Sequence, residues 1–334
     1  MINVKKDSII YVLCPAYIKT GGPELLHQLV FTLNKNGIKS YITYYNIKSE
    51  DKNYTNSDFK KYVNSYKLID EIIDINNNMV IIPETNVELI RMFKNVKKVI
   101  WWLSVDNYEI HHNFKMRKEK NGLLSALKMK ILDILTHKNK DLYKADYHLC
   151  QSYYAIDFLE RKGINNSIYL SDYINDLYLN IKVDYSKKED IVLYNPKKGF
   201  EFTKKLIEKC PSINWVPIQN MTTDEVKNLL LKSKVYIDFG NHPGKDRFPR
   251  ETAMCGCCVI TGKRGAAKFE KDVPILKEYK FDDKDENIDK IIDKIKECLN
   301  NYNKKIKNFD NYRDFILNEK KKFTDDVKSI FIKK

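Results

Sequence analysis

Short apolar runs of strand length alternate with amphipathic segments along the whole chain. Three of these runs are residues 8–15 (SIIYVLCP), 98–103 (KVIWWL) and 235–239 (VYIDF). A continuous apolar run of this length is typical of a strand that is buried on both faces of a parallel sheet. Parallel strands need a crossover between them, and the helical segments in between supply it. The sequence therefore predicts an α/β fold built from doubly wound parallel sheets.

The chain is longer than one usual domain. With 334 residues, two domains of roughly 150 residues each are expected. Residues 175–188 have the polar character of a linker, and a second series of strands and helices begins near residue 190. We therefore predict domains at residues 1–175 and 176–310, followed by a helix at 311–334.

The net charge of +14 and the pI near 9.1 indicate an anionic partner. Nucleic acid, acidic lipid headgroups and sugar nucleotides all meet that requirement. The basic residues are interleaved with acids, as in the C-terminal EKKKFTDDVKSIFIKK, which is typical of a solvated surface. Because no basic and aromatic signature of a nucleic-acid module is present, we expect no nucleic-acid partner.

The seven cysteines are irregularly spaced, and the sequence shows no signal peptide. It also lacks an apolar run of the roughly 20 residues that a membrane span needs. These features predict a cytoplasmic protein with reduced thiols. The pair Cys255 and Cys258 has C-x-x-C spacing, but without nearby histidines it indicates packing rather than a zinc site.

Residues 235–267 contain the densest group of chemically interesting side chains. A strand is followed by a loop with Lys245 and Arg247, a helix that Pro249 is expected to open, a strand at 257–261, and a glycine loop with Arg264. Basic groups at a helix N-terminus favour a phosphate. Glu251 has two interpretations: its carboxylate accepts hydrogen bonds from sugar hydroxyls, or it caps the helix and pairs with Arg247.

Three other loops follow predicted strands and carry candidate ligands. Gly21 and Gly22 allow close approach of the backbone to a ligand. Lys197 and Lys198 end another strand, and with the arginines of the 235–267 stretch they suggest convergent phosphate ligands. Asn220 follows a further strand and is a candidate for nucleobase recognition.

The segment PRETAMCGCCVIT (residues 249–261) resembles the donor-site signature of GT-B glycosyltransferases, in particular the family 4-like group of cell-surface polysaccharide biosynthesis. The resemblance implies that Glu251 holds the nucleotide ribose and that Lys197 and Lys198 clamp the diphosphate. The family pairs this glutamate with an earlier one, whose place falls near residues 242–244 (HPG). That first glutamate is absent, and Cys258 stands where the family usually has proline.

The resemblance also implies an architecture and an activity. Two Rossmann-like domains would face each other across a cleft, with residues 1–175 on the acceptor side, residues 176–310 binding the nucleotide sugar, and helix 311–334 packing back on the first domain. The enzyme would move a sugar from a UDP- or GDP-linked donor to a glycan or lipid-linked glycan, with retention of configuration. Basic loops would offset the charge of the departing diphosphate, so that no metal or other cofactor is required.

The strand at residues 98–103 leads into VDNYEIHH, with Asp106, Glu109, His111 and His112. In the resembling enzymes, the loop after this strand carries a histidine or aspartate that faces the sugar. Asp106 is therefore a catalytic candidate. Adjacent histidines point in different directions, which disfavours a shared metal ion.

Residues 123–135 (LLSALKMKILDIL) form an amphipathic pattern with lysines at 128 and 130. Such a helix lies on a membrane surface or packs on the protein's own core. The first alternative would put the protein at the inner face of the cell membrane.

Two other functions fit the same predicted fold. One is a sugar-nucleotide epimerase, which needs an acid or base placed for proton abstraction at the sugar ring. The other is a non-catalytic partner subunit that keeps the fold and binds no nucleotide.

Overall fold

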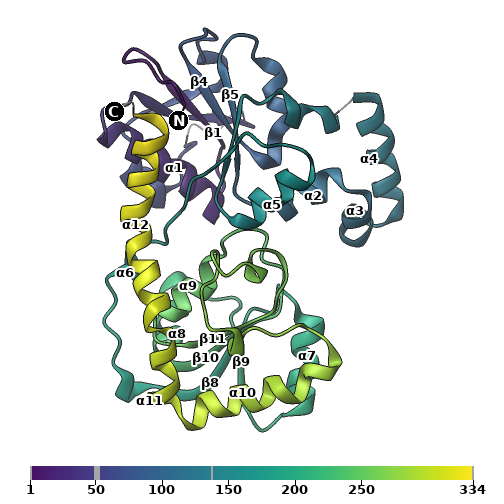
Figure 1. The fold of residues 1–334 in the computed structure, drawn as a ribbon, viewed down its shortest axis with the longest axis vertical. Coiled ribbons are helices and arrows are strands. Elements are labelled where there is room, and N and C mark those ends of the chain that lie inside the picture. Colours follow the sequence, from purple (N-terminus) through teal and green to yellow (C-terminus); the bar gives the residue numbers. More distant parts are fainter. Residues whose placement is uncertain (1, 49–52, 137, 333–334) are drawn as a thin grey trace. The chain divides into compact units, whose positions relative to one another are not determined.

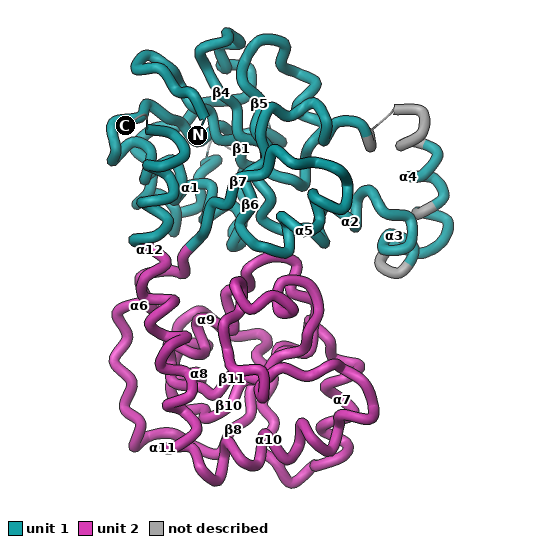
Figure 2. The backbone as a smooth tube through the Cα atoms, in the orientation of Figure 1, with its two compact units in different colours: residues 1–172, 321–334 teal, residues 173–320 magenta. Residues whose placement is uncertain are grey.

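A computed structural model of the protein describes residues 2–48, 53–136 and 138–332. The chain forms two compact units (Figure 2). Unit 1 contains Met1–Asp172 and Lys321–Lys334, and unit 2 contains Tyr173–Lys320. The long C-terminal helix α12 (Asp310–Phe331) therefore contributes its first half to unit 2 and its second half to unit 1.

Unit 1 is built on a parallel sheet of seven strands in the order β3-β2-β1-β4-β5-β6-β7 (Figure 1). Every strand pair in this sheet is parallel. The strands are β1 (Ile10–Pro15), β2 (Ser40–Tyr45), β3 (Tyr66–Leu68), β4 (Met79–Pro83), β5 (Lys97–Trp102), β6 (Tyr147–Cys150) and β7 (Ser167–Tyr169).

Helices connect these strands. They are α1 (Gly21–Lys35), η1 (Ser57–Tyr62), η2 (Ile69–Glu71), η3 (Glu84–Met92), α2 (Val105–His112), α3 (Phe114–Asn121), α4 (Leu123–Thr136), η4 (Lys138–Lys144) and α5 (Tyr153–Arg161). The second half of α12 completes the core of this unit, where the ring of the buried Phe323 stacks on Trp101.

Unit 2 has a smaller parallel sheet in the order β11-β10-β8-β9. Its strands are β8 (Glu189–Tyr194), β9 (Asn214–Pro217), β10 (Ser233–Asp238) and β11 (Cys258–Thr261). Besides the first half of α12, its helices are α6 (Asp176–Leu179), η5 (Tyr185–Lys187), α7 (Phe200–Lys209), α8 (Thr223–Lys232), α9 (Arg247–Met254), η6 (Gly265–Lys268), η7 (Lys277–Tyr279), η8 (Asp285–Asn287), α10 (Ile288–Asn300), α11 (Tyr302–Lys305) and η9 (Ile306–Phe309).

Both sheets are doubly wound, which confirms the predicted fold class. In unit 1 the chain starts at β1 and builds outward on both sides, with β2 on one side and β4 on the other. In unit 2 it starts at β8, with β9 on one side and β10 on the other. Such reversals of strand order leave a crevice at the carboxyl ends of the strands, where ligands of this architecture bind.

All seven cysteines are free and buried. The Cys255 and Cys258 pair lies at the junction of α9 and β11, inside the core of unit 2, as expected for packing residues. Among the described residues, no helix combines the length and apolar character that a membrane crossing requires.

Candidate donor site at the strand ends of unit 2

Three loops of unit 2 bring the predicted phosphate ligands to the carboxyl ends of neighbouring strands. Lys197 and Lys198 follow β8, residues 240–246 follow β10, and Arg264 follows β11. Strands β8 and β10 are adjacent and flank the point where the strand order reverses. The loops therefore lie where a doubly wound sheet binds its ligand.

These loops are packed backbone against backbone. Gly199 has φ +60°, and a Cβ atom there would lie 2.5 Å from the carbonyl of Phe239. Gly265 has φ +57° and approaches the His242 carbonyl just as closely. The backbone N–H of Ala266 also donates to the carbonyl of His242, at 2.8 Å. Only glycine fits at these two close approaches, so the three loops form one continuous surface.

Lys198 is the predicted phosphate ligand with the most defined surroundings. Its ammonium forms an ion pair with Asp246, lies 3.9 Å from Asp238 Oδ2, and leaves the side chain 25% exposed. Lys197 is exposed, and its backbone N–H donates to Asn195 Oδ1 at 3.0 Å, which fixes the turn after β8. The structure thus places one tethered and one exposed ammonium group at the end of β8.

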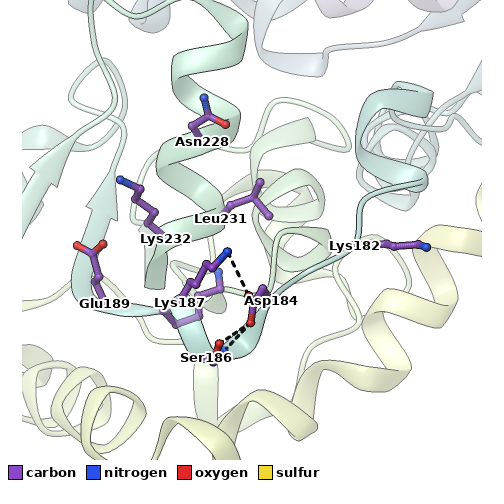
Figure 3. Close-up of a pocket in the computed structure, with 9 residues that line it drawn as sticks. Lys182, Asp184, Ser186, Lys187, Glu189, Asn228, Leu231 and Lys232 are labelled. Carbon is purple, nitrogen blue, oxygen red and sulfur yellow. Dashed lines mark hydrogen bonds and ion pairs between the residues drawn. The ribbon is translucent and has the colours of Figure 1, made fainter.

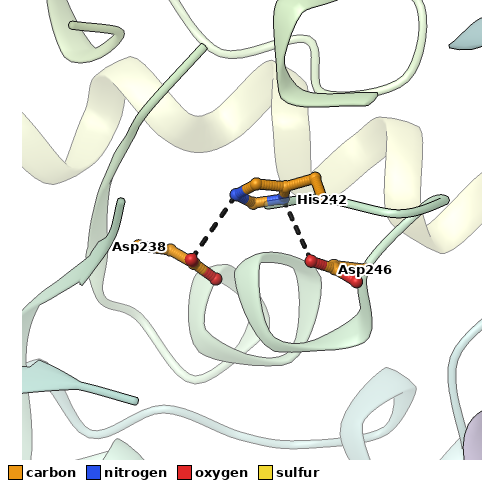
Figure 4. A group of neighbouring side chains, drawn as sticks. All are labelled: Asp238, His242 and Asp246. Atoms are coloured by element: carbon orange, nitrogen blue, oxygen red, sulfur yellow. Dashed lines mark ion pairs between the residues drawn. The ribbon is translucent and has the colours of Figure 1, made fainter. Parts of the chain in front are cut away.

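His242 lies between two carboxylates (Figure 4). Its Nε2 is 3.5 Å from Asp238 Oδ1, and its Nδ1 is 3.2 Å from Asp246 Oδ2. The imidazole is fully buried. Asp238 also accepts hydrogen bonds from Tyr236 Oη at 2.9 Å and from the Gly240 N–H at 3.1 Å. In the sequence, residues 242–244 are marked only by the absence of the family's first glutamate.

Lys245 lies inside unit 2 rather than on its surface. Its ammonium is 2.6 Å from Glu319 Oε1, and the guanidinium of Arg250 is 2.8 Å from the other oxygen of the same carboxylate. All three side chains are almost fully buried. Arg250 also donates to the Lys245 carbonyl at 2.7 Å. This network ties the loop before α9 to α12, and Lys245 acts there as a structural support.

Helix α9 begins earlier than predicted. Its first residue is Arg247, with Asp246 at the N-cap position, so Pro249 is the third helical residue. Proline is tolerated there because N–H groups in the first turn have no partner within the helix. Glu251 consequently belongs to the second turn and is 9% exposed, which does not fit the interpretation that it caps the helix. Its charge helps to raise the pKa of the neighbouring Tyr178, an increase caused mainly by burial.

The other predicted ligands surround the same strand ends. Arg247 is half-buried at the start of α9. Arg264 is 52% exposed and forms an ion pair with Asp283. Asn220 follows β9, is exposed, and adopts the left-handed backbone conformation with φ +54°.

In unit 1, the predicted residues lie at the corresponding strand ends. Gly21 and Gly22 begin α1 after β1, the first strand of this sheet. A Cβ atom on Gly22 would lie 3.6 Å from Leu103, in the loop after β5. Asp106 belongs to α2, is 7% exposed, and accepts a hydrogen bond from Tyr154 Oη at 2.9 Å.

Glu84, directly after β4, was not among the predicted site residues. Its side chain is buried and accepts a hydrogen bond from the Leu103 N–H at 3.0 Å. Burial raises the pKa of this carboxyl group to about 8, against the opposing effect of hydrogen bonds from backbone N–H groups. The sequence shows an acid at the end of the apolar run MVIIP, but it does not show that the side chain of this acid is buried.

A pocket of about 690 Å³ lies elsewhere in unit 2 (Figure 3). It is lined by residues from the linker before β8 and from α8, including Lys182, Lys187 and Lys232. Asp184 lies among them and is 3.4 Å from the Lys187 ammonium. The pocket adjoins Glu189, the first residue of β8. This is the amino end of the sheet, whereas doubly wound sheets bind ligands at the opposite end.

Helix α4 presents an apolar face to solvent. Leu124 is 84% exposed and Ile131 is 60% exposed, and Leu123 and Leu127 are also exposed. Positions 124, 127 and 131 share one face of a helix. The interpretation in which these side chains pack on the core of unit 1 is therefore wrong for the side chains that the structure describes.

No protein-family model matches the sequence, and no curated protein matches it either. Solved structures do share its fold. Sucrose-phosphate synthase from Thermosynechococcus elongatus has a TM-score of 0.57 at 12% identity, covering 97% of this chain and 95% of that one. Anabaena HepE in complex with UDP and glucose has a TM-score of 0.55 at 10% identity, covering 96% of this chain and 98% of that one. An alpha-glucosyltransferase in complex with UDP and DNA has a TM-score of 0.54 at 12% identity, covering 96% of this chain and 99% of that one.

The chain therefore has the GT-B fold of glycosyltransferases, which confirms that part of the resemblance seen in the sequence. At these identities the similarity shows the fold alone.

Proposed function

We propose that the protein is a glycosyltransferase of the family 4-like group. It moves a sugar from a nucleotide sugar to a glycan or lipid-linked glycan in cell-surface polysaccharide biosynthesis, with retention of configuration. The observation that carries this proposal is the group of basic loops at the strand-order reversal of unit 2, on a GT-B fold. Two of the similar structures contain UDP, which supports a UDP- or GDP-linked donor.

The donor would bind mainly through unit 2. Lys197, Lys198, Arg247 and Arg264 would hold the diphosphate, whose negative charge grows as the sugar departs. Fixed cations aimed at that charge lower the barrier without a metal ion or other cofactor. Lys245 would stabilise the loop from within, through Glu319.

Sugar and base contacts complete the proposed donor site. Glu251 would accept hydrogen bonds from the ribose hydroxyls, and Asn220 would contact the nucleobase. In unit 1, Gly21 and Gly22 would leave room for the diphosphate, and Asp106 would face the transferred sugar. The region of residues 1–175, with the end of helix 311–334, would bind the acceptor.

The test compares Lys198→Ala with Lys204→Ala. Lys204 is an exposed lysine of α7 that pairs with Glu208, so it controls for loss of one positive charge. We expect Lys198→Ala to weaken binding of UDP or GDP about tenfold or more and to lower turnover, because the diphosphate loses a direct cation. Equal affinity in the two variants would contradict the assignment of Lys198.

Glu251→Gln tests the ribose contact. We expect a large loss of activity with little change in melting temperature, because glutamine keeps the shape of the side chain. A drop in melting temperature as large as the drop in activity would instead point to a structural role. Incubating the donor without acceptor distinguishes an epimerase, since only an epimerase converts the donor alone.

The exposed face of α4 supports a second part of the proposal, contact with the inner face of the cell membrane. Leu124 and Leu127 would enter the headgroup region, and Lys128 and Lys130 would attract anionic lipid. We expect the wild type to sediment with phosphatidylglycerol vesicles and the variant Leu124→Glu/Leu127→Glu to remain in solution. Leu276→Glu, at a leucine of unit 2 that is 49% exposed, is the matched control. Unchanged sedimentation of the double variant would contradict the contact.

Nucleic acid is not part of the proposal. The alpha-glucosyltransferase with a similar fold was solved with DNA, so DNA belongs among the acceptors to be screened. Because basic residues here are interleaved with acids along the chain, we expect glycan or lipid-linked acceptors to be used and DNA to be inactive.

A further inference from the structure

Three adjacent strands of unit 1 end near helix α2, which contains Asp106. In the sheet order, β5 lies between β4 and β6. Glu84 directly follows β4, and α2 begins shortly after β5. Tyr154 lies at the start of α5, after β6. Helix α2 contacts both η3, which begins with Glu84, and α5. Residues after β4 and after β6 can therefore both act on α2.

The carboxyl group of Glu84 fixes the turn between β5 and α2. Glu84 is 2% exposed, and its Oε2 accepts a hydrogen bond from the Leu103 N–H at 3.0 Å. The backbone N–H of Ser104 donates to the same carboxyl group. Burying a carboxyl group is costly, and hydrogen bonds from the backbone offset part of that cost. The two bonds therefore define the path of the backbone where it leaves β5.

This turn sets the beginning of α2. Ser104 is the N-cap residue, and its Oγ accepts a hydrogen bond from the Asn107 N–H at 3.2 Å. Asp106 is the second residue of the helix, so its backbone moves with Ser104. The Leu103 side chain also lies 3.6 Å from the position of a Cβ atom on Gly22. A shift of the turn would therefore displace Asp106 and disturb the packing on the glycine loop after β1.

Tyr154 holds the side chain of Asp106 itself. The Tyr154 hydroxyl donates to Asp106 Oδ1 at 2.9 Å, and Asp106 is 7% exposed. Helix α5 is anchored at its own start, where Ser152 Oγ accepts from the Ala155 N–H at 3.2 Å. Burial, followed by the charge of Asp106, raises the pKa of Tyr154 well above its ordinary value, so the phenol keeps its proton. Tyr154 is therefore the donor of this bond at neutral pH.

We infer that Glu84 and Tyr154 are positioning residues that together set the carboxylate of Asp106 toward the transferred sugar. This inference rests on the proposed function, in which Asp106 faces that sugar. A group that acts in a transition state must be held closely, because a displacement of about 1 Å can cost about a hundredfold in rate. Glu84 fixes the backbone that carries Asp106, and Tyr154 fixes the orientation of its side chain. Both act on the donor through Asp106.

The first experiment tests the turn before α2 and requires no donor. Amide hydrogen exchange at Leu103 and Ser104 is followed by NMR in wild type, Glu84→Leu and Glu84→Gln. Leucine has similar bulk but no acceptor, whereas glutamine can still accept from the backbone. We expect exchange at both amides to be about tenfold faster in Glu84→Leu, since the amides lose their acceptor, and close to wild type in Glu84→Gln. Wild-type protection in Glu84→Leu would overturn the role of Glu84.

The second experiment separates positioning from donor binding. The probes are UDP-glucose and GDP-mannose, and release of UDP or GDP by transfer to water is measured with the one that the wild type hydrolyses. Tyr154→Phe removes only a hydroxyl group, and Tyr153→Phe, at the neighbouring tyrosine that stacks on Tyr169, is the matched control. We expect kcat to fall about tenfold in Tyr154→Phe with KM unchanged, because an interaction used only in the transition state is weakened. A kcat equal to that of Tyr153→Phe would overturn the role of Tyr154.

A double-mutant cycle tests whether Tyr154 acts through Asp106. In the background Asp106→Ala, we expect Tyr154→Phe to change kcat by less than about twofold, because the hydroxyl has lost the group that it positions. A merely structural role predicts independent effects, with the same loss of kcat in both backgrounds. Glu84→Leu is tested in the same way, and Glu84→Gln should restore most of the wild-type kcat. Melting curves establish that each variant is folded before its rate is compared.

The two levels of the account fail in different ways. A wild type that binds neither UDP nor GDP would refute the proposed function. A wild type that binds one of them and hydrolyses neither probe would contradict the catalytic part of the inference. In both cases the exchange rates of Leu103 and Ser104 would still decide whether Glu84 fixes the turn before α2.

Discussion

The carboxyl group of Glu84 illustrates how burial controls a single acid in this fold. Its pKa in the folded protein is about 8, whereas the ordinary value is 4.5, because burial disfavours the charged form. Between these two values the unfolded chain releases a proton that the folded chain keeps. The free energy of unfolding should therefore fall as the pH rises from about 4.5 to 8.

Glu84→Gln should remove this dependence, since glutamine accepts the same backbone hydrogen bond without ionising. We expect the melting temperature of the wild type to fall across this pH range more steeply than that of the variant. Glu88→Gln, at a half-buried position in the same helix, is the control and should keep the wild-type slope. Identical slopes for wild type and Glu84→Gln would contradict the raised pKa.

Two glycines have similar backbone angles but different surroundings. Comparing their alanine variants therefore distinguishes the effect of backbone strain from the effect of a close contact. Gly199 has φ +60° and touches the Phe239 backbone, whereas Gly163 has φ +75° and open space around its Cα. Alanine at either position should lower stability by about 1 kcal/mol through backbone strain. Only Gly199→Ala should also displace the loop after β8 and reduce UDP affinity. Equal affinity in the two variants would show that the loops tolerate the displacement.

The positions of some candidate residues were predictable from a local rule. Lys197 and Lys198, and likewise Gly21 and Gly22, were chosen because they follow a predicted strand, whose carboxyl end is a binding position in this architecture. The structure places the two loops after β8 and β1, and their role as ligands stays a prediction. The network around Lys245 was not predictable, because its partner Glu319 is distant in sequence and sits in a helix that reads as a solvated surface.

Helix α9 shows how far local signals define an element. Pro249 correctly indicated a first helical turn, but the helix begins two residues earlier, at Arg247, with Asp246 at the N-cap position. Helix α8 begins with a reciprocal capping box of Thr222 and Glu225, in which the Glu225 N–H donates to Thr222 Oγ1 at 3.3 Å.

The junction of α12 with the loop before α9 depends on Glu319, whose carboxylate pairs with both Lys245 and Arg250 in the interior. Glu319→Gln would remove the carboxylate that both buried cations contact. Breaking a buried pair in this way destabilises a protein by about 3–5 kcal/mol. Denaturant unfolding should show a loss of this order, and none for Asp314→Asn at an exposed position of the same helix. A stability close to that of the wild type would mean that the buried charges find other partners.

For the molecule as a whole, the alternation of apolar runs and helices was enough to predict two doubly wound parallel sheets. Each run is long enough to cross a sheet once, and parallel pairing follows from the helices between them. The resemblance implied that helix 311–334 packs back on the first domain. No local pattern, however, predicted that the first half of α12 belongs to unit 2 or that the ring of Phe323 stacks on Trp101 in unit 1. That contact joins residues far apart in the chain, and no local pattern encodes it.

Binding of a nucleoside diphosphate tests the central proposal most directly. The melting temperature should be measured with UDP, GDP, ADP and CMP, and with uridine as a ligand that lacks phosphate. At a concentration one hundred times its Kd, a ligand stabilises the folded state by about 2.7 kcal/mol. We predict that UDP or GDP raises the melting temperature clearly, that uridine does not, and that Lys198→Ala abolishes most of the increase. No stabilisation by any nucleoside diphosphate, or equal stabilisation by uridine and UDP, would contradict a diphosphate site at the strand ends of unit 2.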